Sequence, residues 1–149
     1  MILPEYKDFK AAFVEGRNQV IYKRLAADLD TPVSLLLKLT SASKNAFILE
    51  SVTGGEIRGR YSIIGMKPDL VWKCEGKTSF INRSARFDDD NFEEQEMTPL
   101  DAFRALLKES YIEMPDGLPQ ASAGLFGCHG YDMIRLVEQL PDVNPDPLG

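Results

Sequence analysis

One short stretch of the sequence gathers an acid, a hydroxyl and a cation around a glycine turn. Glu50 and Ser51 stand where an apolar run ends, a Gly-Gly pair follows, and Arg60 starts the next apolar run. The carboxylate could pair with an ammonium group, the hydroxyl could form a hydrogen bond, and Arg60 could pair with a carboxylate or orient Glu50. The arrangement suits a zwitterion, but the residues alone favour a salt bridge at the mouth of a hairpin.

A second unusual stretch, residues 123–132, reads AGLFGCHGYD. Its glycines at 124, 127 and 130 allow backbones to approach closely. Asp132 falls in the first turn of the helix expected next, where a negative charge is favoured. By itself the stretch predicts a tightly packed transition from a strand to a helix.

The sequence carries no recognisable catalytic or metal-binding motif. The single histidine, His129, adjoins Cys128, but neighbouring residues on a strand point to opposite faces. The sequence has no GxxxxGK[ST], no GxGxxG after a strand, no HExxH and no GxSxG. Cys74 and Cys128 belong to no CxxC pair, and we expect both thiols to be free and at least half-buried. We therefore assign no catalytic residue and no metal ligand.

Composition and charge set the class of protein. A chain of 149 residues with 44% hydrophobic side chains suits one globular domain. The net charge of −6 equals the six acids of Asp88–Glu96, which we expect to be a solvated loop, so the remainder is neutral. Nucleic acid and anionic membranes are therefore not expected partners. The N-terminus does not resemble a secretory signal and no apolar run reaches 18 residues, which predicts a cytoplasmic protein.

The elements that must position these residues follow from periodicity and turn signals. We expect helices over 4–16, 31–39, 98–111 and 130–140, and strands over 20–25, 46–52, 60–66, 69–75, 78–82 and 123–127. Gly76-Lys77 between two strands predicts a type II′ hairpin. Short strands with tight connections predict an α+β fold, mainly antiparallel sheet with packed helices.

The predicted core follows the apolar faces of these elements. We expect the helix over 31–39 to be buried on more than one side, and Trp72 to lie in the core. The two later helices should bury the following residues: Leu100, Phe103, Leu106, Leu107 and Tyr111 in the first, and Met133, Ile134, Val137 and Leu140 in the second.

Two sequence blocks together resemble a known family. LES-V-T-G followed by GRYSIIG-x-x-P, and later G-L-F-G-x-x-G-Y-D-x-x-R-x-x-E-x-L-P, are similar to the N-terminal region of anthranilate synthase component I, a chorismate-utilising enzyme. The resemblance runs over nearly the whole chain. Ala123 and Cys128 depart from the glycine and tyrosine that the family usually has at those positions.

The resemblance implies that residues 1–149 are an N-terminal regulatory, tryptophan-binding fragment and that the catalytic chorismate-binding domain is absent. The intact enzyme would use Mg²⁺ to convert chorismate and ammonia to anthranilate and pyruvate in tryptophan biosynthesis. A glutamine amidotransferase, component II, would supply the ammonia. Within the fragment we expect no cofactor and no lyase activity.

The resemblance also implies a feedback site for tryptophan, with the contributing residues Leu49, Glu50, Ser51, Arg60 and Tyr61. The resemblance therefore favours a tryptophan site over the salt bridge at the mouth of a hairpin. Two alternatives stay open: aminodeoxychorismate synthase component I, of the folate pathway, and a non-catalytic amino-acid-binding regulatory module.

Overall fold

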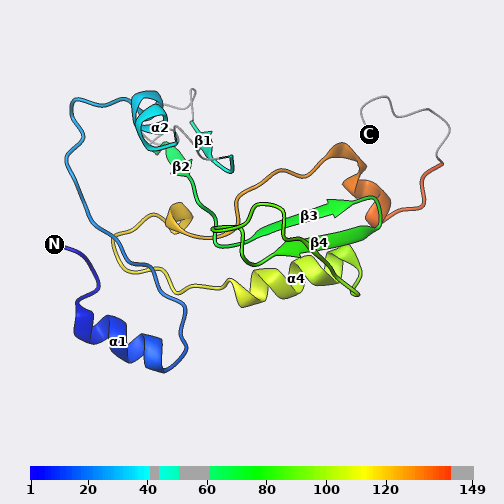
Figure 1. The fold of residues 1–149 in the computed structure, drawn as a ribbon, viewed down its shortest axis with the longest axis horizontal. Helices are drawn as coiled ribbons and strands as arrows, with labels where there is room; N and C mark the ends of the chain where they lie inside the picture. The colour runs from blue at the N-terminus through cyan, green and yellow to red at the C-terminus, as the bar shows by residue number, and fades with distance from the viewer. Residues whose placement is uncertain (41–43, 51–60, 142–149) are drawn as a thin grey trace.

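The structure is a computed structural model, and it describes residues 1–40, 44–50 and 61–141 (Figure 1). The helices are α1 (Tyr6–Val14), α2 (Pro32–Thr40) and α4 (Pro99–Glu109), with 3₁₀ turns η1 (Gln120–Ser122) and η2 (Tyr131–Leu136). The strands are β1 (Phe47–Leu49), β2 (Ile63–Gly65), β3 (Val71–Glu75), β4 (Thr78–Asn82) and β5 (Glu93–Glu94). None of the helices in these ranges is long and apolar enough to cross a bilayer.

The strands form two antiparallel sheets, which confirms the predicted α+β class. One sheet has the order β1-β2 and the other the order β3-β4-β5. Glu75 pairs with Thr78 across a two-residue loop, and Gly76 has a φ of 58°, the positive value that a type II′ turn requires at its first position. α2 lies beside β1, and α4 lies along β4 (Figure 1).

Side-chain caps fix where two of the helices begin. At α4 the Thr98 hydroxyl accepts a hydrogen bond from the Asp101 amide at 3.3 Å and donates one to the Asp101 carboxylate at 2.7 Å. At α2 the Thr31 and Ser34 hydroxyls each accept a hydrogen bond from the other residue's amide, at 3.1 and 3.0 Å. These reciprocal bonds satisfy amides that a helix start leaves unpaired.

The buried core is small and lies around β4 and α4. Its buried apolar residues in the described ranges are Ile81, Ala85, Pro99, Ala102 and Leu106. Asn82 is also fully buried, where its amide donates to the Asp88 carbonyl at 2.7 Å and its carbonyl accepts from the Ser84 amide at 2.9 Å. Burial of Asn82 removes the Asn82-Arg83-Ser84 glycosylation signal from solvent.

Three predicted elements were wrong, and a fourth prediction was incomplete. The strand expected over 20–25 is a single bridge between Leu3 and Tyr22. The strand expected over 123–127 does not form: residues 125–130 are irregular and pair with no strand of the described chain. The helix expected over 130–140 is a 3₁₀ turn over Tyr131–Leu136. The acidic stretch is more than a loop, because Glu93 and Glu94 pair with Ile81 and Phe80 as an edge strand.

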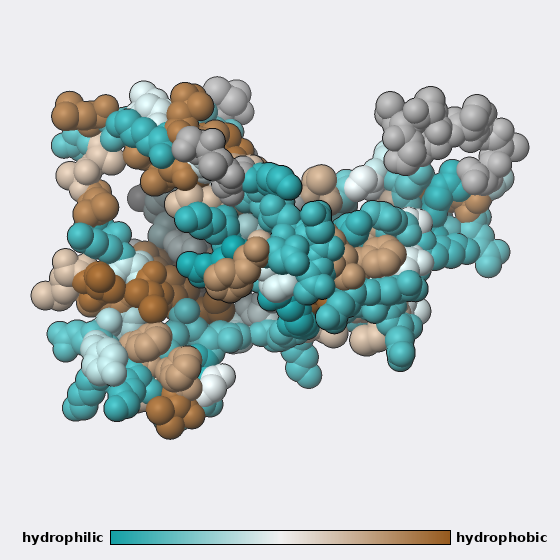
Figure 2. Space-filling model, viewed as in Figure 1, coloured by the Kyte–Doolittle hydropathy of each residue, from teal (hydrophilic) through white to brown (hydrophobic). Residues whose placement is uncertain are grey.

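The predicted burial was also partly wrong. Neither α2 nor η2 has a buried residue, and Leu37 of α2 is 68% exposed. In α4, Leu106 is buried but Leu107 is exposed, and Tyr111, two residues beyond the end of the helix, is exposed as well. Cys74 is half-buried as expected, whereas Cys128 is exposed. Exposed apolar side chains gather near α1 and α2 (Figure 2), because no described element covers these faces.

Candidate functional site

Three of the five predicted site residues lie in the described part of the chain. Leu49 ends β1 and is 51% exposed, Glu50 follows it and is exposed, and Tyr61 precedes β2 with 54% exposure. Ser51 and Arg60 lie outside the described residues. The structure thus leaves the apolar and acidic members of the predicted site open to a ligand.

The β1-β2 ladder brings the two halves of this site together. Its register pairs Leu49 with Ile63, so their side chains share one face of the sheet. Glu50 directly follows Leu49 on one strand, and Tyr61 lies two residues before Ile63 on the other. Both residues therefore leave the ladder at the same end, as the sequence predicts for a hairpin mouth.

Gly65 holds the other end of this ladder together through close packing. It pairs with Phe47, and a Cβ at position 65 would lie 2.1 Å from the Phe47 ring. Only glycine therefore lets the ring cross β2. The last glycine of the GRYSIIG block has this packing role.

Phe47 also links the two sequence blocks that carry the family resemblance. Its ring lies 5.1 Å from that of Phe126, centroid to centroid, in the glycine-rich stretch. At the far end of that stretch, His129 meets the Phe103 ring edge-on at 5.6 Å, and Phe103 lies 5.2 Å from Trp72. The glycine-rich stretch thus contacts β1 at one end and α4, next to β3, at the other.

Sequence reasoning missed this aromatic connection. The signal was present, since Phe47 opens the apolar run before Glu50 and Phe126 is the aromatic residue among the glycines. Trp72 itself is half-buried, and its indole N–H donates a hydrogen bond to the Gln95 side chain at 2.8 Å. His129 packs on a ring and is exposed, so its observed contact is structural.

A large hollow lies between the two sheets along this aromatic connection. It measures about 2120 Å³, and its lining includes Phe47, Ile64, Trp72, Phe103, Phe126 and Leu136. Pockets for small molecules measure about 300–1,000 Å³. The hollow therefore exceeds what a single small ligand fills.

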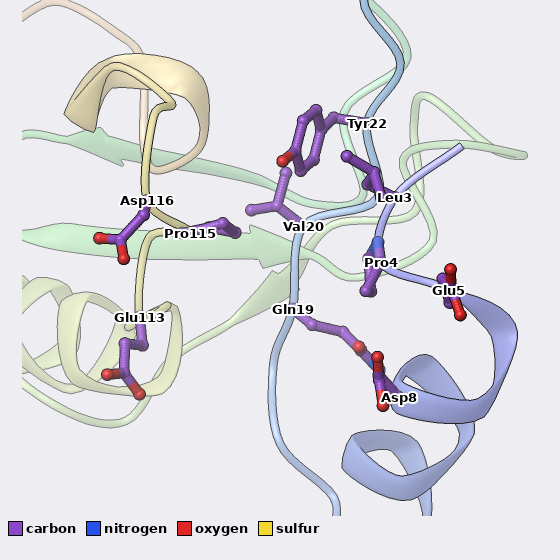
Figure 3. A pocket seen from close by; sticks show the side chains of 10 residues that line it. All are labelled: Leu3, Pro4, Glu5, Asp8, Gln19, Val20, Tyr22, Glu113, Pro115 and Asp116. Carbon is purple, nitrogen blue, oxygen red and sulfur yellow. The ribbon is translucent and has the colours of Figure 1, made fainter. Parts of the chain in front are cut away.

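A smaller cavity of about 510 Å³ lies near the N-terminus (Figure 3). Leu3, Val20 and Pro115 give it an apolar side, and the carboxylates of Glu113 and Asp116 point away from Leu3 and Val20. No predicted site residue lines it.

An ion pair with two hydrogen bonds lies away from the predicted site. Arg83 donates two hydrogen bonds to the Glu109 carboxylate, at 2.6 and 2.8 Å, tying the end of β4 to the end of α4. The guanidinium lowers the pKa of Glu109 and the carboxylate raises that of Arg83. Burial raises the pKa of the Cys74 thiol, which makes it less reactive.

Comparison with known proteins finds relatives in the family that the two sequence blocks resemble. The chain is 60% identical over 147 residues to anthranilate synthase component 1 of Cereibacter sphaeroides, covering 99% of this chain and 29% of that protein. The proteins of the same name from Pseudomonas aeruginosa and Synechocystis are 37% and 35% identical, over 96% and 99% of this chain and 29% and 28% of theirs. The chain thus spans less than a third of the length of these relatives. No family model and no solved structure matches it.

Proposed function

Since this chain is homologous to the N-terminal part of anthranilate synthase component 1, we propose that it is the regulatory part of a longer anthranilate synthase. The longer protein converts chorismate and ammonia to anthranilate and pyruvate in the cytoplasm. The observation that carries this proposal is the 60% identity over 147 residues. The chain by itself has no lyase activity, as we assign it no catalytic residue.

The proposed partner is a glutamine amidotransferase, component II, which supplies ammonia. The designation component 1 in the relatives supports a second component. The resemblance also implies Mg²⁺ in the intact enzyme. In the described ranges no three His, Cys, Asp or Glu side chains come together as metal ligands, so these residues do not fit the ion.

Tryptophan is the proposed ligand of the site at the end of β1. Glu50 pairs with its ammonium group, Arg60 with its carboxylate, and Ser51 adds a hydrogen bond. Leu49 and Tyr61, each about half-exposed, offer apolar surface to the indole ring. Because this surface is open, other walls of the pocket come from the longer protein, and the chain alone binds tryptophan weakly or not at all.

Inhibition follows from binding to one of two conformational states. If tryptophan binds the state with low affinity for chorismate more tightly, it shifts the population toward that state. The coupling is reciprocal, so chorismate must weaken tryptophan binding by the same factor.

Product identification on the longer protein tests the proposed activity. Chorismate and ammonium should give anthranilate and pyruvate. Aminodeoxychorismate as the product would favour the alternative synthase, and a protein that binds tryptophan without consuming chorismate would favour a regulatory module.

Ser51→Phe tests the proposed tryptophan site. In the longer protein the bulky ring should fill the pocket and abolish inhibition while turnover stays near the wild-type value. Lys10→Phe, on the exposed surface of α1, is the matched control and should keep normal inhibition. Superimposable inhibition curves for Ser51→Phe and wild type would refute the site.

A further inference from the structure

The chain exposes far more surface than a compact protein of its mass. Its accessible surface is 12499 Å² for 16.7 kDa. A compact monomer of that mass exposes about 7,600 Å² on the usual scaling of area with mass. The difference, roughly 4,900 Å², is the scale of surface that further polypeptide would cover in a compact fold.

Part of this surface is a glycine-rich segment, residues 124–129, whose backbone is unpaired within the described part of the chain. Within the ranges that the structure describes, no N–H or C=O of this segment takes part in a backbone hydrogen bond. Leu125 and Phe126 are nevertheless apolar, with 36% and 37% exposure. The segment therefore offers backbone donors and acceptors beside apolar side chains, as the unpaired edge of a sheet does.

The surroundings of the segment favour a polypeptide as its partner. The segment lines the hollow of about 2120 Å³, whose walls include the Phe47, Phe103 and Trp72 rings. Such a volume is too large for one small ligand but suits packed side chains from another segment. A strand laid beside 124–129 would satisfy its backbone and place alternate side chains in the hollow.

We propose that residues 124–129 pair as a β-strand with a strand from the longer polypeptide, whose apolar side chains fill this hollow. The inference rests on the proposed function, namely that the chain is part of a longer protein. More than two thirds of the Cereibacter sphaeroides relative lies outside the matched region, which provides enough chain. The site at the end of β1 is then joined to the rest of the protein through the contact between Phe47 and Phe126.

Hydrogen exchange on the longer protein, read by mass spectrometry, tests this pairing. Peptides covering 124–129 should exchange at least a hundredfold more slowly than an unstructured chain, as the paired β3-β4 peptides do. Exchange at the unstructured rate in 124–129, with β3-β4 protected, would overturn the inference.

The 149-residue chain separates the two sources of a partner strand. In it, 124–129 should exchange freely at any protein concentration. Protection of 124–129 in this shorter chain, together with a dimer in sedimentation, would mean that a second copy fills the hollow and would overturn the inference.

A pair of variants of the longer protein tests the apolar contact. Phe126→Asp should raise the exchange rate of 124–129 at least tenfold. Phe87→Asp, at a ring that is 90% exposed and does not line the hollow, should leave it unchanged. Equal exchange in both variants would contradict the inference.

The outcome is independent of the activity assay. A longer protein that makes anthranilate but exchanges freely at 124–129 refutes the pairing and leaves the proposed function intact. A longer protein that protects 124–129 but makes no anthranilate supports the pairing and refutes the proposed function.

Discussion

At the residue scale, the proposed recognition of tryptophan depends on charges that do not show in the net charge. Glu50 and Arg60 cancel in the sum of −6, which equals the charge of the acidic stretch 88–96. Glu50 is exposed at the end of β1, where an ammonium group can reach it. Composition therefore says nothing about this site, and the residue types at the ends of two strands carry the information.

Replacing Glu50 by Gln should weaken inhibition by tryptophan. The change removes the charge from a hydrogen bond worth about 1.5–3 kcal/mol, so the inhibition constant in the longer protein should rise about tenfold or more. Asp28→Asn, at an exposed acid remote from β1 in sequence, is the control and should leave the constant unchanged. An unchanged constant in Glu50→Gln would exclude the assigned role.

Replacing Gly65 by Ala should disturb packing at the other end of the same ladder. The added Cβ would lie 2.1 Å from the Phe47 ring, and displacing that ring costs about 1–3 kcal/mol, as overpacking does. Gly127→Ala is the matched control, because a Cβ there meets no atom within 4 Å. Urea unfolding of the 149-residue chain should show a lower midpoint for Gly65→Ala only, and equal midpoints would contradict the packing role.

At the element scale, α4 is held by carboxylates that act only when ionised. Hydrogen bonds from Thr98 and Arg104 lower the pKa of Asp101, and Arg83 lowers that of Glu109. A carboxyl group whose pKa is lowered by folding stabilises the fold at pH values above its pKa in the unfolded chain, which is about 4. That contribution is lost as the pH falls through the lower folded-state pKa.

The stability of α4 should therefore fall between pH 5 and pH 2. Asp101→Asn should reduce this dependence on pH, because the neutral amide does not titrate on acidification. The measurement is the urea midpoint of the 149-residue chain, from helical circular dichroism, at pH 7 and pH 2.5. Asp116→Asn, at an exposed acid with no hydrogen bond to the described residues, should keep the full dependence. The same loss in Asp101→Asn and wild type would refute the role of the cap.

Elements set by local chemistry were predictable from the sequence, and those set by distant partners were not. The starts of α2 and α4 follow from Thr31 and Thr98, and the hairpin of β3 and β4 follows from Gly76. By contrast, β5 exists because Glu93 and Glu94 meet β4, which no periodicity signals. The strand expected over 123–127 has the right composition but no ladder in the described chain.

The sequence pointed to the proposed site for a different reason. The motif blocks pointed to Glu50, and the register of β1 and β2 explains why residues on both sides of the glycine turn belong together. The contact of Phe47 with Phe126 joins residues 79 positions apart, and the sequence pattern alone does not predict it.

At the whole-molecule scale, the open form of the chain agrees with its share of the relatives' length. The buried core is confined to β4 and α4, while apolar faces of α2, η2 and the glycine-rich segment stay uncovered by described residues. A chain that spans 29% of a relative is expected to need the remainder for these faces. The uncovered hollow runs along the short β1-β2 ladder, from Phe47 to Tyr61, a residue of the proposed feedback site.

The most direct test of the account is the rate of anthranilate formation by the longer protein. With chorismate and ammonium, anthranilate fluorescence should appear, and added tryptophan should suppress it in a saturable way that higher chorismate opposes. Consumption of chorismate without anthranilate, or a rate of anthranilate formation that tryptophan leaves unchanged, would contradict it.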